Sequence, residues 1–415
     1  MYKVTLEKVR EAAAHLESVV LETPLVINET QSRKYSSSIF FKREDLQQVR
    51  SYKIRGAYNK ISNLSENELS RGVVCASAGN HAQGVAFSCS KLEIKGLIFM
   101  PTPTPKQKIE QVKMFGGNFI EVILTGDTFD DASKEARSYS EQNHLPFIHP
   151  FDDEKVIEGQ ATIALEILDQ SHVGIDVLFL PVGGGGVASG ISSVFKALSP
   201  QTKIIGVEPE GAPSMSVSIQ NKINTALESV DKFVDGASVK KVGALNFEIC
   251  QKHLDEMATV HEGKICQTIL DMYNKDAIVV EPAGAMTVAV LDQYRQEIIG
   301  KNVVCLLSGS NNDITRTEEI KERALLHAGV KHYFVVRFPQ RAGALKEFIE
   351  KVLGPKDDIT HFEYSKKQSR TNAPAVVGIE LGNSDGLRPL VNRMKEFNFF
   401  GEYLNDKPDL FQFLI

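Results

Sequence analysis

Short, almost continuous apolar runs alternate with helical stretches between about residues 70 and 310. The runs read "GVVCA", "GLIFM", "NFIEVIL", "VLFLPV", "KIIGVE" and "NVVCLL". Strands that are buried on both faces have this composition, and helices between them indicate parallel crossover connections. The pattern therefore predicts a doubly wound α/β architecture. In such a sheet ligands bind beyond the carboxyl ends of the strands, so the loops that follow these runs are candidate sites.

A different order of elements begins near residue 331. "KHYFVVRFP" is typical of a strand, and "RAGALKEFIEKVLG" of a helix that ends at Gly354. "DITHFEYSKK" and "PAVVGIELG" indicate two more strands, "DGLRPLVNRMKEF" a second helix and "FFGEYL" a last short strand. The order βαββαβ predicts a ferredoxin-like module of about 85 residues. The stretch "KERALLHAGVKH" is expected to link the two parts.

Composition excludes several classes of protein. The 415 residues predict two or three domains, at roughly 100–200 residues per domain. The net charge is −6 without a basic stripe, which argues against a nucleic-acid partner. The five cysteines are scattered and never spaced C-x-x-C, as expected for reduced thiols in a cytoplasmic protein. The first 20 residues place charges among helically spaced apolar residues, which fits neither a signal peptide nor a membrane span.

Lys53 stands where a helix is predicted to begin, in "SYKIRGAYNK". Ser51 is a good N-cap, which would place Lys53 in the first turn. The positive end of the helix dipole disfavours an ammonium group there. The position lowers the pKa of the amine and favours its neutral, nucleophilic form, provided that water is excluded. Taken alone, the stretch fits a solvated lysine better.

Two loops after predicted strands have the composition of anion sites. "SAGNHAQG", residues 77–84, offers glycine, short polar side chains and a helix start that suit a carboxylate, although a plain capped turn fits equally well. "GGGG", residues 183–186, precedes a helix, so its backbone amides predict a phosphate cradle. No Gly-Lys-Ser/Thr follows, which excludes a P-loop, and a dinucleotide site is the weaker alternative.

Ser308 follows the run "NVVCLL" in the same way. Its hydroxyl would either cap the next helix or bond a heteroaromatic nitrogen without fixing a positive charge on it. A lysine for a Schiff base, a phosphate cradle and a neutral partner for a ring nitrogen are together what pyridoxal 5'-phosphate requires. The combination predicts a pyridoxal phosphate enzyme.

The same stretches resemble a known family. "KREDLQQVRSYKIRGAY", "SAGNHAQGVA", "PVGGGGVASG", "VEPEGA", "EPAGA" and "LLSGSN" are similar to motifs of the threonine dehydratases (threonine ammonia-lyases), which are fold-type II, tryptophan-synthase-β-like enzymes. The resemblance covers about residues 5 to 325. "FPQRAGAL" in the last module resembles the ACT-like regulatory domain of the biosynthetic members. It implies a catalytic domain of two doubly wound subdomains over residues 1–325 and one α+β ACT-like domain over residues 331–415.

The resemblance also implies roles for individual residues. Lys53 would be the catalytic lysine that binds the cofactor covalently, Asn80 would bond its ring hydroxyl and Ser308 its ring nitrogen. The phosphate would be held by the backbone of Gly183, Gly184, Gly185, Gly186 and Val187. The substrate carboxylate would be bound by the loop that contains Ser77, Ala78, Gly79 and His81. Glu281 would be a further pocket residue.

One departure concerns metals. Related serine racemases bind a divalent cation near the motif that matches "VEPEGAPS", with an acidic residue where this chain has Ser214. We therefore predict no metal site.

The implied reaction converts L-threonine to 2-oxobutanoate and ammonia, the first step of isoleucine biosynthesis. Serine dehydration or racemisation in the same site is the nearest alternative, because one methyl group discriminates by only about 1–3 kcal/mol. A nucleotide-dependent oxidoreductase and a non-catalytic amino-acid sensor are alternatives from other classes. An aldimine would make the enzyme yellow, unlike an empty Rossmann domain, and an intact Lys53 argues against a sensor.

The last module is expected to bind an amino-acid effector, isoleucine or valine, and to lower activity. Arg341 and Gly343 are placed where a strand gives way to a helix, whose free amides suit a carboxylate. Phe338 and Leu345 fit the module's core better than a pocket. A sheet edge or face on so small a module also predicts a homo-oligomer, a dimer or tetramer, with the effector pocket between subunits.

Overall fold

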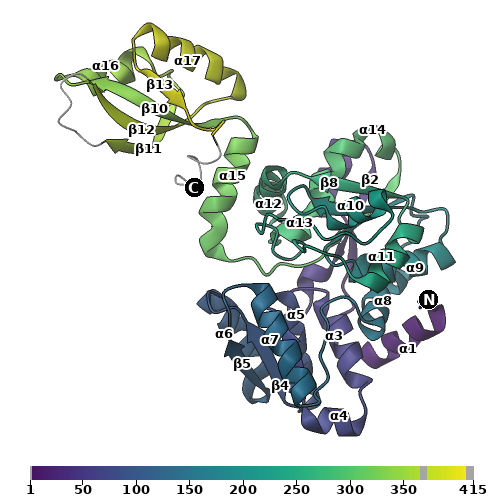
Figure 1. Ribbon diagram of the computed structural model, residues 1–415. Helices are drawn as coiled ribbons and strands as arrows, with labels where there is room; N and C mark the ends of the chain where they lie inside the picture. The colour runs from purple at the N-terminus through teal and green to yellow at the C-terminus, as the bar shows by residue number, and fades with distance from the viewer. Residues whose placement is uncertain (1, 365–371, 408–415) are drawn as a thin grey trace. The chain divides into compact units, whose positions relative to one another are not determined.

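The computed structural model describes residues 2–364 and 372–407. The chain divides into two compact units, Met1–Asp313 and Ile314–Ile415, and each is described by itself (Figure 1). Among the described residues, no helix combines the length and the apolar composition that a bilayer span requires.

The first unit contains two sheets. The larger has the strand order β1-β2-β9-β6-β7-β8 and the smaller β3-β4-β5. All neighbouring strands pair in parallel except β1, an antiparallel edge strand on β2. The bounds are β1 (Leu25–Ile27), β2 (Ser38–Arg43), β3 (Val73–Ala76), β4 (Gly96–Met100), β5 (Ile120–Leu124), β6 (Val177–Pro181), β7 (Lys203–Pro209), β8 (Glu256–Val260) and β9 (Asn302–Leu307).

All six apolar runs form strands, as predicted. In chain order they are β3, β4, β5, β6, β7 and β9. Three further strands were not predicted. β1 is only three residues long, and "SIFFKR" in β2 and "EMATV" in β8 carry polar residues that dilute the apolar signal. β1 and β2 form one end of the larger sheet, and β8 is the strand at its other end. Partial exposure at the ends of a sheet removes the need for a continuous apolar run.

The small sheet is covered on both faces. Val73 and Cys75 of β3 belong to the core formed with α5 (Asn80–Leu92) and α6 (Lys106–Gly116). Val74 and Ala76 pack instead in the core that includes α7 (Phe129–Gln142). Alternate residues therefore face opposite layers, as the period of a strand requires. Figure 1 shows these helices around β4 and β5.

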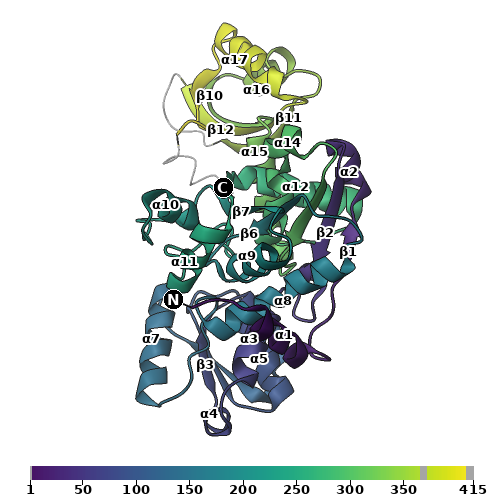
Figure 2. The same ribbon diagram turned by 90° about the vertical axis from the view of Figure 1, so that its right-hand side faces the viewer.

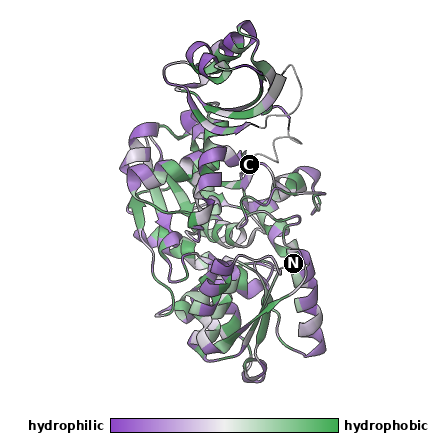
Figure 3. Cartoon of the chain, turned by 90° about the vertical axis from the view of Figure 1, so that its left-hand side faces the viewer, coloured by the Kyte–Doolittle hydropathy of each residue, from purple (hydrophilic) through white to green (hydrophobic). Residues whose placement is uncertain are grey.

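The large sheet is covered in the same manner. Leu178 and Leu180 of β6 pack in the core that contains α8 (Glu154–Gln170) and α9 (Gly186–Leu198). On β9, the Cys305 thiol donates to the carbonyl of Thr287 in α13 (Pro282–Ala289), at 3.4 Å. Figure 2 shows β6 and β7 close to α9, and in Figure 3 the strands are largely hydrophobic while the helices carry both hydrophilic and hydrophobic residues.

The first unit contains further α-helices. They are α1 (Leu6–Leu16), α2 (Glu29–Tyr35), α3 (Lys53–Ser62), α4 (Glu66–Arg71), α10 (Ser214–Asn221), α11 (Ala244–His253), α12 (Glu262–Asp276) and α14 (Arg295–Ile298). Among them, α1 and α3 pack on α8.

Lys53 is the first residue of α3, which confirms its predicted place in the first turn. The predicted N-cap is wrong. Tyr52 occupies that position without a side-chain cap, and the buried hydroxyl of Ser51 has no hydrogen-bond partner among the described residues. Ser51 instead forms an isolated β-bridge with Gly309, because the chain enters the helix from a contact with the loop after β9.

The second unit begins with α15 (Thr317–His327) and has the predicted βαββαβ order. Its antiparallel sheet has the order β11-β12-β10-β13. The bounds are β10 (Lys331–Pro339), α16 (Ala344–Lys351), β11 (Asp358–Tyr364), β12 (Asn372–Glu380), α17 (Leu387–Glu396) and β13 (Phe400–Tyr403).

Three details of this module differ from the sequence prediction or extend beyond it. Helix α16 ends at Lys351, before the predicted Gly354, whose amide is instead bonded to Asp357 at 2.7 Å. Phe338 lies in the core as predicted, but Leu345 does not, because it is 43% exposed on the outer side of α16. Residues 365–367 of the predicted strand "DITHFEYSKK" lie outside the described residues.

Candidate active site

A pocket in the first unit lies at the carboxyl ends of strands from both sheets. Asn80 follows β3, Gly183 follows β6 and Ser308 follows β9, the position at which parallel sheets bind ligands. The lining residues are Tyr52, Lys53, Asn80, Pro181, Gly183, Gly236, Ala237, Glu281, Ala283 and Ser308. The fold thus brings together residues that are as far apart in sequence as Lys53 and Ser308.

Lys53 presents its amine to this pocket. Nζ donates a hydrogen bond to the backbone carbonyl of Pro150 at 2.9 Å, and it lies 5.3 Å from the centre of the Tyr52 ring. Burial lowers the pKa of Lys53 to about 8, against the opposing effect of the Glu281 carboxylate. The neutral fraction of the amine near physiological pH is therefore much larger than that of a free lysine, which favours its action as a nucleophile or base.

The glycine loop, residues 183–186, exposes backbone amides rather than side chains. A Cβ on Gly184 would lie 2.3 Å from the Phe151 ring, and Gly185 has φ +94°, so neither position accepts another residue without strain. The loop leads into α9, and from Gly184 to Val187 its residues are buried. Within the described part of the chain, no protein group accepts from the amides of residues 183–188.

Buried backbone amides are almost always hydrogen-bonded, so this row of donors at a helix N-terminus fits an anion. Gly183, at the start of this row, lines the same pocket as the Lys53 amine. The donor set is therefore that of the predicted phosphate cradle.

Asn80 and Glu281 form a pair on the pocket wall. Nδ2 of Asn80 donates to Oε1 of Glu281 at 2.7 Å, and Oδ1 of Asn80 accepts from Asn311 at 2.6 Å. Burial, together with the charge of Asp235, raises the pKa of Glu281 to about 7. The Asn80 amide is held at both ends, so its orientation is set before any ligand binds.

Ser308 is 2% exposed and lines the pocket. Its carbonyl accepts from the amide of Tyr52 at 3.2 Å, which ties the end of β9 to the start of α3. The hydroxyl has no protein partner among the described residues, so it is available to a ligand.

The predicted substrate loop lies beside the pocket. The Ser77 hydroxyl accepts from the Gly79 amide at 3.3 Å, and Ser77, Ala78, Gly79 and His81 are not among the lining residues. His81 is buried, and its Nε2 lies 2.9 Å from the carbonyl oxygen of Ile148. Burial and the charge of Lys53 lower the pKa of His81 to about 3, which keeps the ring neutral.

Several pocket residues were not predicted from the sequence. Tyr52 precedes Lys53, Pro181 precedes the glycine loop, and Gly236 and Ala237 come from a loop between α10 and α11. Small residues in "VDGAS" and "EPAGA" were the available signal, since they permit close approach of a ligand. The carbonyl of Pro150 carried no signal, because any residue supplies one.

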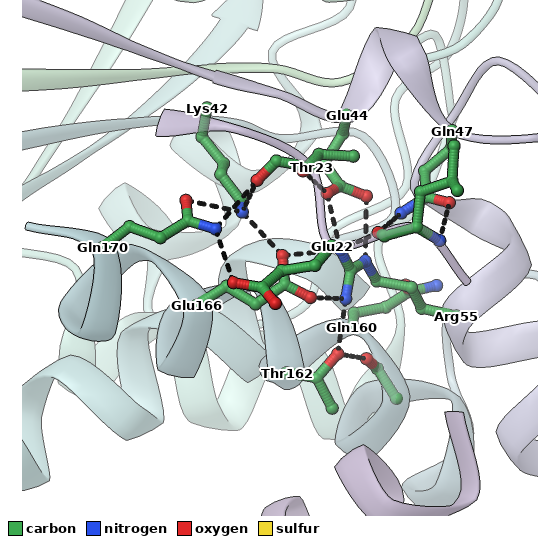
Figure 4. A network of polar contacts seen from close by, with 12 residues as sticks. Glu22, Thr23, Lys42, Glu44, Gln47, Arg55, Gln160, Thr162, Glu166 and Gln170 are labelled. Carbon is green, nitrogen blue, oxygen red and sulfur yellow. Dashed lines mark hydrogen bonds and ion pairs between the residues drawn. The ribbon is translucent and has the colours of Figure 1, made fainter. Parts of the chain in front are cut away.

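A second cluster of charges surrounds Arg55, which lies on the same helix as Lys53 (Figure 4). The Arg55 guanidinium bonds both oxygens of Glu44, at 2.8 and 2.9 Å, and both oxygens of Glu166, at 2.5 and 2.9 Å. Lys42 reaches Glu166 at 2.6 Å from β2. Burial alone would raise the pKa of Glu44, but the charge of Arg55 outweighs it and the pKa is lowered. The cluster fixes α3 to α8 and to the end of β2.

The motif "VEPEGAPS" forms hydrogen bonds within the protein at the start of α10. The Glu208 carboxylate accepts from the amides of Met215 and Ser216, at 2.7 and 2.8 Å, at the start of α10. The Ser214 hydroxyl donates to the carbonyl of Val239. Among the described residues, no group of three or more histidine, cysteine or acidic side chains is placed to hold a metal ion.

Comparison with known proteins agrees with this geometry. Residues 16–309 match the family model "Pyridoxal-phosphate dependent enzyme", and residues 322–414 match "C-terminal regulatory domain of Threonine dehydratase". The chain belongs to the pyridoxal-phosphate dependent enzymes. The match covers both sheets and every lining residue of the pocket.

Comparison with individual proteins places the chain in a smaller group within this family. The chain is 54% identical to the L-threonine dehydratase biosynthetic IlvA of Halalkalibacterium halodurans over 415 residues, 100% of both chains. The solved threonine deaminase isoform 2 of Solanum lycopersicum, in its processed form, is 42% identical over 77% of this chain and 88% of that one, with a TM-score of 0.74. Serine racemase from Dictyostelium discoideum is more distant, at 31% identity, TM-score 0.69 and 75% and 99% coverage. Among pyridoxal-phosphate enzymes, this chain groups with the biosynthetic threonine dehydratases.

Proposed function

We propose that this chain is an L-threonine ammonia-lyase that forms 2-oxobutanoate and ammonia, the first step of isoleucine biosynthesis. One observation carries the proposal: the amides of residues 183–188 have no acceptor among the described residues, and Gly183 at the start of this row lines the same pocket as Lys53, whose pKa is lowered to about 8. Similarity over the full length to a biosynthetic threonine dehydratase supports the choice of substrate.

The residues of the pocket fit pyridoxal 5'-phosphate. Lys53 would hold it covalently, the amides of residues 183–187 would hold its phosphate, and Asn80 and Ser308 would bond the ring hydroxyl and the ring nitrogen. When bound, this cofactor supplies a conjugated ring that spreads the electron pair left at the substrate's Cα. Ser308 is neutral and therefore does not fix a positive charge on the ring nitrogen, which favours elimination over reactions that need a long-lived carbanion.

The protein's own groups supply binding and proton transfer. The neutral Nζ of Lys53 would take the proton from Cα of the substrate, and burial favours this neutral form by lowering the pKa of the amine to about 8. The loop that contains Ser77, Ala78, Gly79 and His81 would bind the substrate carboxylate beside the N-terminus of α5.

The test is an assay of the purified protein with pyridoxal phosphate and either L-threonine or L-serine. We expect 2-oxobutanoate from threonine at a higher kcat/KM than pyruvate from serine. A higher value for serine, or racemisation as the main reaction, would replace the proposal with the serine alternative. A protein that binds no pyridoxal phosphate would refute both.

We further propose a catalytic domain over residues 1–325 and a regulatory domain over residues 331–415 that binds isoleucine or valine and lowers activity. The regulatory-domain match supports this assignment. Arg341 and Gly343 would receive the effector carboxylate at the start of α16, where Gly343 has φ +83°. Arg341 now pairs with Glu347, so an effector would compete with that carboxylate. Coupling of about 1–3 kcal/mol would change substrate affinity roughly 5–150-fold, and unchanged kinetics with both amino acids would refute the assignment.

A cytoplasmic homo-oligomer completes the proposal. All five cysteines are buried free thiols, which suits a reducing compartment. Phe362 and Tyr364 of the edge strand β11 are 40% and 41% exposed, and this strand would suit pairing with a second copy of the chain. Light scattering of the purified protein at several concentrations measures the assembly.

A further inference from the structure

A short strap, residues 148–152 with the sequence "IHPFD", contacts both Lys53 and the glycine loop. At its start, Phe147 forms a β-bridge with Val74 of the small sheet. At its end, Asp153 caps α8, which packs on the large sheet. The strap thus belongs to the connection between the two halves of the catalytic unit.

One side of the strap holds the lysine. The carbonyl of Pro150 accepts from Nζ of Lys53 at 2.9 Å. Proline has no N–H, so this carbonyl is the only backbone hydrogen-bonding group that the residue has. The carbonyl of Ile148, two residues before Pro150, lies 2.9 Å from Nε2 of the buried His81, which fixes the backbone just before the lysine contact. A neutral amine that donates one N–H to a fixed carbonyl has its lone pair confined to the remaining directions.

The other side of the strap holds the glycine loop. The Phe151 ring occupies the space where a side chain on Gly184 would lie. Nδ2 of Asn246 lies 3.0 Å from both the Phe151 carbonyl and the Gly184 carbonyl, so a single amide joins the strap to the loop. The Asp152 carboxylate accepts from the first two amides of α11, at 2.9 and 3.0 Å, and α11 is the helix that carries Asn246.

His149 sets the shape of the strap. Its Nδ1 accepts from the backbone amides of Phe151 and Asp152, at 3.2 and 2.8 Å. Backbone amides can only donate, so Nδ1 is unprotonated and Nε2 carries the proton. The His149 and Phe151 rings also meet edge to face, with centroids 4.7 Å apart and planes at 87°. The arrangement is that of an Asx turn, with a ring nitrogen in place of the carboxamide oxygen.

We propose that His149 is a positioning residue for the reaction: through Nδ1 it holds the strap so that the Pro150 carbonyl orients the Lys53 amine while Phe151 supports the glycine loop. The proposal rests on the proposed function in one respect, that Lys53 and the glycine loop bind pyridoxal phosphate. It assigns to His149 no contact with the substrate. To hold the strap, the residue at position 149 needs a hydrogen-bond acceptor at the position of Nδ1, but it does not need an imidazole ring.

Substitutions at His149 separate the acceptor from the ring. Asn places an oxygen the same number of bonds from Cα as Nδ1, whereas Gln places it one bond further, and Phe keeps the ring without an acceptor. We expect His149→Asn to keep the apparent Kd for pyridoxal phosphate within about threefold of wild type, and His149→Gln and His149→Phe to raise it about 5–150-fold, the loss expected for an unsatisfied polar group. The change in kcat for threonine should follow the same order, with a smaller change in KM.

The measurements are the visible absorbance of full-length protein titrated with pyridoxal phosphate, the steady-state kinetics, and thermal unfolding of the cofactor-free protein. His172→Gln is the matched control, because His172 is exposed and follows the far end of α8 from the strap. If His149→Phe does not fold, the comparison of Asn with Gln decides. Equal affinities for the Asn and Gln variants, or an Asn variant as impaired as Phe, would overturn the proposal. Failure of the wild-type protein to bind the cofactor would instead refute the proposed function.

Discussion

Lys53 and Arg55 lie within one turn of α3, yet their surroundings are opposite. Arg55 is 1% exposed and has two carboxylates, Glu44 and Glu166, each bonded through both oxygens. The Lys53 amine donates a hydrogen bond to the Pro150 carbonyl, and no described carboxylate lies within ion-pair distance of it. The pKa of Lys53 accordingly falls to about 8, while the guanidinium stays charged.

The difference shows how one helix serves both folding and chemistry. A buried cation with matched anions keeps its charge and fixes the elements that supply those anions, here α3, α8 and the end of β2. A buried amine without an anion loses its proton readily and becomes reactive. The Arg55 cluster holds the helix in place, and the same helix then presents Lys53 where charge is disfavoured.

The largest effect is expected from removing the amine. Lys53→Ala should lower threonine turnover by at least about 10²–10⁴-fold, the contribution of a general base alone, because both the base and the link to the cofactor are lost. Assays of 2-oxobutanoate with excess enzyme measure the remainder. A loss smaller than tenfold would contradict the assignment of Lys53.

Breaking the paired cation should affect folding instead. Arg55→Met leaves the buried Glu44 carboxylate without its ion-pair partner and leaves Glu166 with Lys42 alone, and it should lower the free energy of unfolding by about 3–5 kcal/mol. Lys53→Met is the matched control on the same helix, and it should change stability much less because it leaves no buried charge unpaired. Urea unfolding of the two cofactor-free variants tests this, and equal destabilisation would remove the distinction between the two cations.

Ser308→Ala should weaken cofactor binding while leaving the fold intact. The ring nitrogen would lose its partner in a partly dry pocket, at a cost of about 1–3 kcal/mol in binding free energy. Ser310→Ala is the control, because the Ser310 hydroxyl donates to the carbonyl of Asp45 rather than facing the pocket. Titration of absorbance with pyridoxal phosphate measures both, and unchanged affinity in Ser308→Ala would make this hydroxyl a structural group.

The smallest expected effect is a shift in pH dependence. The neutral form of Lys53 reacts with the cofactor, so the rate of cofactor association with the cofactor-free protein should rise with pH through a midpoint near 8. The Glu281 carboxylate raises the pKa of Lys53, so Glu281→Gln should lower the midpoint, by about one unit or less. Stopped-flow absorbance measures the midpoint, and a value near that of a free lysine would show that the amine is not desolvated.

Prediction from sequence succeeded where the signal is local. The six apolar runs form strands, and the last module has its predicted order of elements, because strand and helix periods are written in neighbouring residues. Prediction failed at Ser51, whose side chain does not cap α3, and at Leu345, which is exposed. In both cases the surroundings, not the local pattern, decided which way the side chain faces.

The sequence by itself determined the two kinds of fold, the position of Lys53 at a helix start and the amide-rich loop after β6. These depend on composition and spacing over a few residues. Only the tertiary structure decided which cation is paired: Glu166 reaches Arg55 across 111 positions of the chain, and the Pro150 carbonyl reaches Lys53 across 97. Burial and partners at such distances set whether an amine stays charged, and no local pattern encodes them.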